Sequence, residues 1–84
     1  MKIKARFFAL YRELTGSSEL ELEVEEGITV AGLKEKVTRD FPQLQGHAHS
    51  LMMAVNSEYA APDVKLSPGD EVAFLPPLSG GSRG

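Results

Sequence analysis

The sequence predicts a two-layer α+β domain in which one helix lies across a sheet. Residues 2–8 and residues 19–24 alternate polar and apolar side chains, and this period of two is typical of strands with one buried face. Residues 30–41 instead carry apolar side chains at the spacing of one helix face. An amphipathic helix packed on a sheet buries both apolar surfaces, which gives the two-layer arrangement.

The composition is that of one small domain stabilised by packing. The chain has 84 residues, 42% of them hydrophobic, and no cysteine. This excludes disulfides, thiolate nucleophiles, iron–sulfur clusters and cysteine zinc sites. The net charge of −3 argues against nonspecific nucleic-acid binding. Because no apolar run approaches the ~20 residues of a membrane span and the N-terminus lacks a signal-peptide pattern, we expect a cytoplasmic protein that binds neither nucleic acid nor membranes.

The first two strands are predicted to pair antiparallel. A short helical turn over residues 9–14, closed by Gly16, connects them. The polar faces of the two strands carry opposite charges, from Lys2, Lys4 and Arg6 on one and from Glu19, Glu21 and Glu23 on the other. Opposite charges that face each other across a strand pair stabilise its register. We therefore interpret these charges as structural and not as a binding site.

The predicted helix starts after Thr29, a residue type that caps helices, and ends before Pro42. Glu35 and Arg39 on its polar side have the spacing of an i, i+4 ion pair. Residues 43–50 carry poor signals and are expected to form a loop. The apolar stripe of the helix consists of Val30, Leu33, Val37 and Phe41.

The remaining elements are short strands joined by turns. Residues 51–55 are apolar and are expected to form a buried strand, and a turn at residues 56–58 precedes Tyr59, which begins a further short strand. Residues 67–70 read Ser-Pro-Gly-Asp, which is a strong turn sequence. This turn leads into the last strand, residues 71–75.

Two histidines in the predicted loop are the candidate metal ligands. His47 and His49 are two residues apart and share a face if the backbone is extended. A metal site needs further ligands, and the sequence offers no evident partner nearby. We expect solvated histidines and no metal site.

The C-terminal stretch changes character twice after the last strand. Pro76 and Pro77 have no backbone N–H, so the sheet cannot continue through them, and they favour an extended backbone. Gly80 and Gly81 then have no side chain, so their backbone fits a narrow channel. A stiff segment with a slender tip suits entry into another protein's active site, and an ordinary frayed terminus is the alternative.

Three residues, Ser82, Arg83 and Gly84, follow this pair of glycines. Chemistry that needs a terminal glycine carboxylate is blocked until they are removed. We expect a folded domain over residues 1–78 and a flexible tail over residues 79–84. Whether the extension is native, removed by processing or added during cloning stays open.

Three blocks of the sequence resemble the small, sulfur-carrying subunit of molybdopterin synthase. They are Phe7-Phe8-Ala9 with Arg12-Glu13-Leu14, then Ala54-Val55-Asn56, and the stretch from Gly69 to Gly81. The last block is the most specific, because it combines a Gly-Asp turn, an apolar strand, Pro-Pro and Gly-Gly at fixed spacing. The resemblance covers residues 1–81 and implies the ubiquitin-like β-grasp fold, with a mixed sheet and one main helix across it.

The resemblance also implies a role in molybdenum cofactor biosynthesis. In this family an E1-like enzyme uses ATP to adenylate the terminal glycine, and a sulfur donor converts the adenylate into a thiocarboxylate. The tail then enters the large subunit of a heterotetramer and donates sulfur to a pterin precursor. The reactive carbon would belong to Gly81, reached through Gly80, once residues 82–84 are removed. The chain itself would bind no cofactor and would be a non-catalytic subunit, since the active site lies on the large subunit.

A docking face for the large subunit is expected on the side of the sheet away from the helix. Phe8 puts a large apolar side chain on the polar face of the first strand, and Leu75 shares that face on the last strand. The resemblance makes these two strands neighbours and adds Tyr59, where the family has a large apolar residue. Such a cluster near a functional tail indicates an interface, unless local chain covers Phe8. The remaining candidates for partner contacts are Arg12, Pro77 and Leu78.

Two alternatives stay open. One is a carrier for another pathway, such as thiamin or amino-acid sulfur delivery, or a protein conjugated to lysines. The other is a β-grasp binding module without an activated terminus, which the residues after Gly81 keep open.

Overall fold

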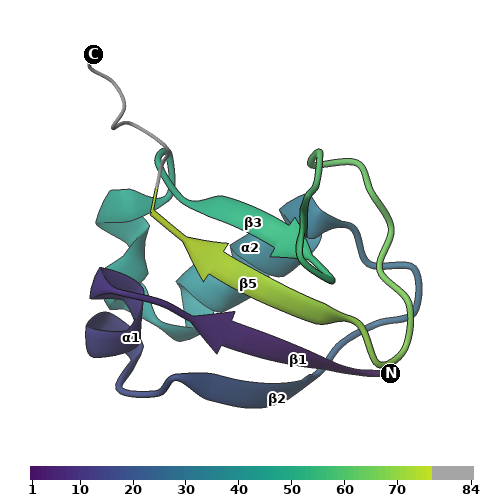
Figure 1. Ribbon diagram of the computed structural model, residues 1–84, viewed down its shortest axis with the longest axis horizontal. Helices are drawn as coiled ribbons and strands as arrows, with labels where there is room; N and C mark the ends of the chain where they lie inside the picture. The colour runs from purple at the N-terminus through teal and green to yellow at the C-terminus, as the bar shows by residue number, and fades with distance from the viewer. Residues whose placement is uncertain (77–84) are drawn as a thin grey trace.

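A five-stranded sheet with the order β2-β1-β5-β3-β4 is the framework of the molecule (Figure 1). The computed structural model describes residues 1–76. Its strands are β1 (Lys2–Phe7), β2 (Glu19–Glu23), β3 (Met52–Val55), β4 (Glu58–Tyr59) and β5 (Glu71–Leu75). Its helices are α1 (Leu10–Thr15), α2 (Val30–Asp40) and the 3-10 helix η1 (Pro42–His47). The β1–β5 pair is parallel and the other pairs are antiparallel, so the predicted mixed sheet is confirmed.

The core lies between the sheet and α2, which crosses behind the strands in Figure 1. The inward faces of the central strands and the inner stripe of α2 supply most of the buried side chains, among them Ile3, Ala5, Phe7, Val72, Phe74, Val30, Leu33 and Val37. Full burial of a large apolar side chain contributes about 1.5–3 kcal/mol. The period-two and helical patterns of the sequence therefore mark the residues that stabilise the domain.

The charged faces of β1 and β2 pair in the predicted register. The partners across the ladder are Lys2 and Glu23, Lys4 and Glu21, and Arg6 and Glu19. The closest ion pair between these strands is diagonal, with Lys4 Nζ 2.9 Å from Glu19 Oε2. These pairs are exposed to solvent, so they contribute little to stability and serve mainly to fix the register of the two strands.

Helix α2 begins and ends where the sequence predicts. The Thr29 hydroxyl accepts a hydrogen bond from the Gly32 N–H at 3.1 Å, which satisfies one of the free donors of the first turn. At the other end Phe41 leaves the helical region, with φ −123° and ψ 84°. This follows from Pro42, whose ring disfavours helical backbone in the residue before it.

Two local predictions are wrong. Residues 43–47, predicted as part of a loop over residues 43–50, belong instead to η1, because Pro42 suits a first helical turn and Leu44 is fully buried. The predicted pair of Glu35 and Arg39 is also not found within residues 1–76. The ion pair of α2 joins Lys36 and Asp40 at 3.5 Å instead.

Two tight turns complete the sheet. Asn56 and Ser57 both have positive φ, 50° and 76°, as a two-residue hairpin that follows the twist of its strands requires. This hairpin places Tyr59 of β4 opposite Ala54 of β3. A short strand is present as predicted, but it starts one residue earlier, at Glu58, and ends at Tyr59. Gly69 has a φ of 83° in the turn before β5, where a side chain would be strained.

Within residues 1–76, no helix combines the length and the apolar character that crossing a membrane would require.

Candidate docking surface

The side of the sheet that faces away from α2, here called the open face, gathers side chains from neighbouring strands. Residues paired across strands share a face. One row therefore runs across four strands and contains Arg6, Ala73, Ala54 and Tyr59. The next row contains Leu75 of β5 opposite Met52 of β3.

Phe8, the residue that follows β1, extends this second row by one position. It follows Phe7, which pairs with Phe74, so its register position is beside Leu75. The Phe8 N–H donates to the Phe74 carbonyl at 3.3 Å, which continues the parallel pairing by one residue. The Phe8 side chain is 37% exposed, so the alternative that local chain covers it is wrong. Phe8, Leu75 and Met52 form what we call the end patch.

Leu75 is less exposed than predicted. Its side chain is half-buried, because β5 is a central strand and the end patch gives Leu75 a neighbour on either side. The prediction of an exposed Leu75 is therefore only partly right. Met52 was not recognised from the sequence, although its position two residues before Ala54 puts it on the same face.

Tyr59 lies on the open face but apart from Phe8. Its side chain is 53% exposed on the edge strand β4. Three strand spacings separate β4 from β1, which amounts to about 14 Å. The structure thus places Tyr59 at the far side of the same surface from Phe8, with β5 and β3 between them. A partner that contacts both Phe8 and Tyr59 must cover most of the open face.

Arg12 is exposed on α1, the short helix that follows Phe8. The backbone turns sharply at Ala9, where φ is 52°, and α1 starts directly after it. Arg12 therefore belongs to the same end of the sheet as Phe8, but to a different element from the open face.

The tail residues with the predicted chemistry lie outside the described part of the chain. These are Pro77, Leu78, Gly80 and Gly81, together with the predicted domain boundary at residue 78. What the structure does place is the point where β5 ends. Because β1 and β5 are parallel, Leu75 and Phe8 lie at the same end of the sheet (Figure 1). The chain leaves the sheet beside the end patch.

Charge divides the open face into two halves. The half over β1 and β2 carries three basic residues and three glutamates, and the half over β3 and β5 is mainly apolar. The hydrogen bond and charge of Glu19 raise the pKa of Lys4 above its usual value. The same contact from Lys4 lowers the pKa of the Glu19 carboxyl. Both groups therefore stay charged at neutral pH, and this half of the face is a solvated ion-pair ladder.

Arg6 joins these two halves, which the sequence did not predict. It faces Glu19 across the β1–β2 ladder, but its Nη1 atom donates to Glu71 Oε2 on the other neighbour, β5, at 2.9 Å. Its guanidinium carbon also lies 5.3 Å from the centre of the Phe8 ring. The signal available in the sequence was that Glu71 is two residues before Ala73, and thus on the same face.

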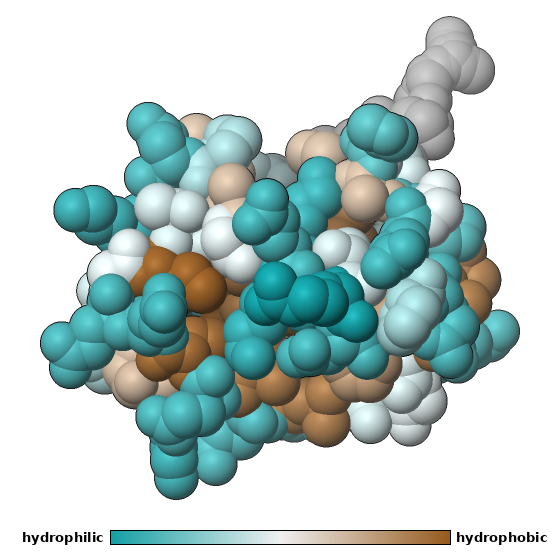
Figure 2. Space-filling model, turned by 180° about the vertical axis from the view of Figure 1, so that it is seen from behind, coloured by the Kyte–Doolittle hydropathy of each residue, from teal (hydrophilic) through white to brown (hydrophobic). Residues whose placement is uncertain are grey.

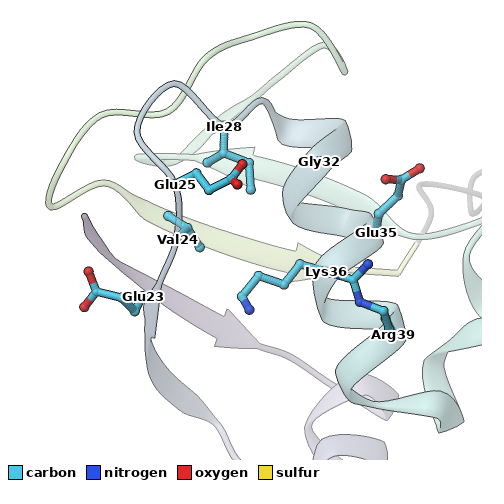
Figure 3. A pocket seen from close by; sticks show the side chains of 8 residues that line it. All are labelled: Glu23, Val24, Glu25, Ile28, Gly32, Glu35, Lys36 and Arg39. Carbon is cyan, nitrogen blue, oxygen red and sulfur yellow. The ribbon is translucent and has the colours of Figure 1, made fainter.

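The opposite side of the molecule is mostly hydrophilic (Figure 2). A hollow of about 480 Å³ lies there between α2 and the chain that follows β2. Figure 3 shows Lys36 and Arg39 on α2 across this hollow from Glu23 and Glu25. Charges of both signs line it, so it selects neither an anion nor a cation. A second hollow, of about 430 Å³, is mainly apolar and lies between α2, the start of β3 and Tyr59.

The two histidines do not form a metal site in the part of the chain that is described. No group of three or more histidine, cysteine, aspartate or glutamate residues is placed to hold a metal within residues 1–76. His47 is half-buried and packs edge-on against Tyr11, with ring centres 6.1 Å apart, so the expectation of a solvated side chain is wrong for it. His49 is exposed.

Comparison with known proteins shows the family to which this chain belongs. The model of the ThiS family matches residues 5–81. The chain is 39% identical over 83 residues to the molybdopterin synthase sulfur carrier subunit of Chlamydomonas reinhardtii, covering 96% of this chain and 100% of that one. It is 37% identical over 81 residues to the Escherichia coli protein of that name, covering 94% and 99%.

The fold has a close counterpart among solved structures. A Pyrococcus furiosus protein described as molybdopterin converting factor, subunit 1, superposes with a TM-score of 0.85 at 30% identity, over 93% of this chain and 99% of that one. The predicted β-grasp architecture is confirmed. The chain belongs to the ThiS family of ubiquitin-like β-grasp proteins.

Proposed function

We propose that this protein is the sulfur-carrier subunit of molybdopterin synthase. The observation that carries the proposal is the end patch, an apolar surface beside the point where β5 ends, in a chain whose next residues lead to Gly80 and Gly81. Relatives that match over nearly their whole length bear the name of that subunit. A docking surface and a transferable chain end in one small domain suit a protein that delivers a group and performs no catalysis itself.

The chemistry takes place at the carbonyl carbon of Gly81, once that residue ends the chain. An E1-like partner transfers the AMP moiety of ATP to the Gly81 carboxylate and releases pyrophosphate. A hydrosulfide equivalent from a sulfur donor then attacks this carbon, the bond to AMP breaks, and a thiocarboxylate and free AMP result. The thiocarboxylate sulfur passes to a pterin precursor in the active site of the large subunit. The small domain supplies no acid or base to these steps, and ATP is bound by the activating partner.

The described residues fix the position from which the tail leaves the domain. Strand β5 is paired on both sides, with β1 and with β3, so its end cannot shift without breaking the centre of the sheet. Pro76 then stops the ladder because it has no N–H to donate. Binding of the end patch by the large subunit would therefore aim the tail, because the patch and the start of the tail belong to the same rigid strand.

A second candidate is a protein modifier. It is favoured by the likeness to the small archaeal modifier protein SAMP1 of Haloferax volcanii, with a TM-score of 0.84 and 26% identity over 96% of this chain and 100% of that one. A modifier and a sulfur carrier share the activated glycine and differ in what attacks it, a lysine amine or a sulfur donor. We favour the carrier, because the curated relatives at higher identity are carriers.

The proposal is tested by measuring the intact mass of the protein after purification from its native host. The expected species ends at Gly81, and a fraction of it is heavier by the difference between one sulfur and one oxygen atom. Deletion of the gene for the activating enzyme should abolish the heavier species only. A population that retains Ser82 to Gly84 in wild-type cells would contradict the carrier function and favour a binding module. Conjugates to lysines would favour the modifier.

A further inference from the structure

Arg6 touches both the charged and the apolar half of the open face. Its Nη1 atom donates to Glu71 Oε2 at 2.9 Å, and its guanidinium carbon is 5.3 Å from the centre of the Phe8 ring. The side chains of Arg6 and Glu71 are 47% and 40% exposed. The contacts therefore form at the surface, beside the end patch, and not in the core.

Three features of the sheet produce this geometry. Arg6 and Phe8 are two residues apart, so both project from the same face of β1. Ala73 of β5 lies directly opposite Arg6, and its small side chain leaves room for the long arginine to reach diagonally to Glu71 on the same strand. Lys4, which is the residue opposite Glu71, turns the other way and binds Glu19 at 2.9 Å. Lys4 therefore does not compete with Arg6 for the Glu71 carboxylate.

The Glu71 carboxylate starts from a well-fixed backbone. The Glu71 N–H donates to Asn56 Oδ1 at 3.0 Å, and its carbonyl accepts from the Asn56 N–H at 2.7 Å. The Asn56 side chain also donates to Asp70 Oδ1 at 3.0 Å. These bonds tie the start of β5 to the β3–β4 hairpin. A chain of contacts thus runs from that hairpin through Glu71 and Arg6 to the Phe8 ring.

We propose that Arg6 is a positioning residue for docking of the large subunit, which rests on the function proposed above. Held by Glu71, its guanidinium fixes the Phe8 ring in one orientation before the partner arrives. An exposed aromatic ring that rotates freely loses this freedom when it enters a partner's pocket, and the lost entropy weakens binding. A ring that is already held in one orientation avoids this loss. A surface cation–π contact has the strength to change Kd roughly two- to five-fold, so Arg6 adjusts affinity and does not decide whether the complex forms.

The test is a double-mutant cycle on the full chain with the large subunit from the same genome, measured by isothermal titration calorimetry. Arg6→Met keeps the apolar stem and removes the charge, and it should raise Kd roughly two- to five-fold. In a Phe8→Ala background the same change should have almost no effect. Lys4→Met is the matched control, since it removes an equal charge from the same face of β1, and it should leave Kd unchanged.

A second measurement uses the free chain. The Phe8 ring current should shift the Arg6 δ-methylene protons upfield in the NMR spectrum, and Glu71→Gln should move them back toward random-coil values. An unshifted Arg6 in the wild type, or an Arg6→Met effect that persists without Phe8, overturns the proposal. Equal losses from Arg6→Met and Lys4→Met overturn it too. If the wild-type chain fails to bind the large subunit, the proposed function itself fails.

Discussion

The Phe7 ring stacks on the Phe74 ring in the core, with the ring centres 5.0 Å apart, and this contact joins the first strand to the last. The residues that follow these two in the chain, Phe8 and Leu75, project from the opposite face and belong to the end patch. One parallel strand pair therefore supports the core on one side and the proposed docking surface on the other. The two roles fall on adjacent residues and can be separated by mutation.

Phe7→Ala should destabilise the fold much more than Phe8→Ala. Phe7 is almost fully buried, so its truncation should lower the free energy of unfolding by about 3–5 kcal/mol. Phe8→Ala, the same change one residue away on the exposed face, should cost less than about 1 kcal/mol. Urea unfolding followed by circular dichroism measures both. Similar losses for the two variants would contradict this assignment of faces.

Phe8→Glu should weaken the complex with the large subunit, because it puts a charge into the centre of the proposed interface. We expect an increase in Kd of at least about tenfold, measured by calorimetry or by loss of co-purification. Val64→Glu is the matched control, since Val64 and Phe8 are both 37% exposed and Val64 lies in the loop between β4 and β5. Leu75→Glu should act like Phe8→Glu, with some loss of stability because Leu75 is half-buried. If the Phe8 variant binds as tightly as the Val64 variant, the docking surface lies elsewhere.

Gly81→Val should stop sulfur delivery without affecting docking, because a branched side chain obstructs the narrow approach to either active site. Thiocarboxylate formation by the activating enzyme, followed by intact mass, should fall below detection, while Kd for the large subunit should change less than about threefold. Ser79→Val provides a control for adding bulk to the tail. An unimpaired Gly81→Val variant would be incompatible with a carrier role for this residue.

Thr29→Ala should destabilise the fold and leave partner binding intact. The hydroxyl caps the first turn of α2, and its loss typically costs about 0.5–2 kcal/mol. Since α2 covers the face opposite the end patch, Kd for the large subunit should stay the same. Thr38→Ala is the control within the same helix, because that hydroxyl bonds only to carbonyls of the preceding turn, at 2.9 Å for Lys34. Equal effects of the two changes would mean that the cap does not stabilise the helix.

The ion pair of Lys4 and Glu19 should stabilise the fold over the whole neutral range. The lowered pKa of Glu19 means that its contribution is present above the unfolded value of about 4.3 and is lost as pH falls through the folded pKa. The raised pKa of Lys4 means that its contribution is present below about 10.4 and is lost as pH rises through the folded pKa. Lys4→Met should thus raise the Glu19 pKa in an NMR titration. Lys2→Met, whose ammonium is 3.9 Å from Glu21, should leave the Glu19 pKa unchanged.

The sequence by itself determined those features that depend on local periodicity and turn chemistry. Alternation placed Phe7 inside and Phe8 outside, and it set the register of β1 against β2 because a shift by one residue would bury the charges. Thr29 and Pro42 marked the ends of α2 through their own side chains. The resemblance to a known family added that β1 and β5 are neighbours, and the structure confirms this pairing.

Only the tertiary structure decided which ion-pair partner a charged side chain has when several are within reach. Arg6 lies opposite Glu19 in the register but binds Glu71, because Lys4 already pairs with Glu19 and the small Ala73 leaves room for a diagonal contact with β5. Segment 42–47 became helical because burial of Leu44, and not its weak local pattern, stabilises it. These outcomes depend on distances between strands that are remote in sequence, and such distances exist only after the chain has packed.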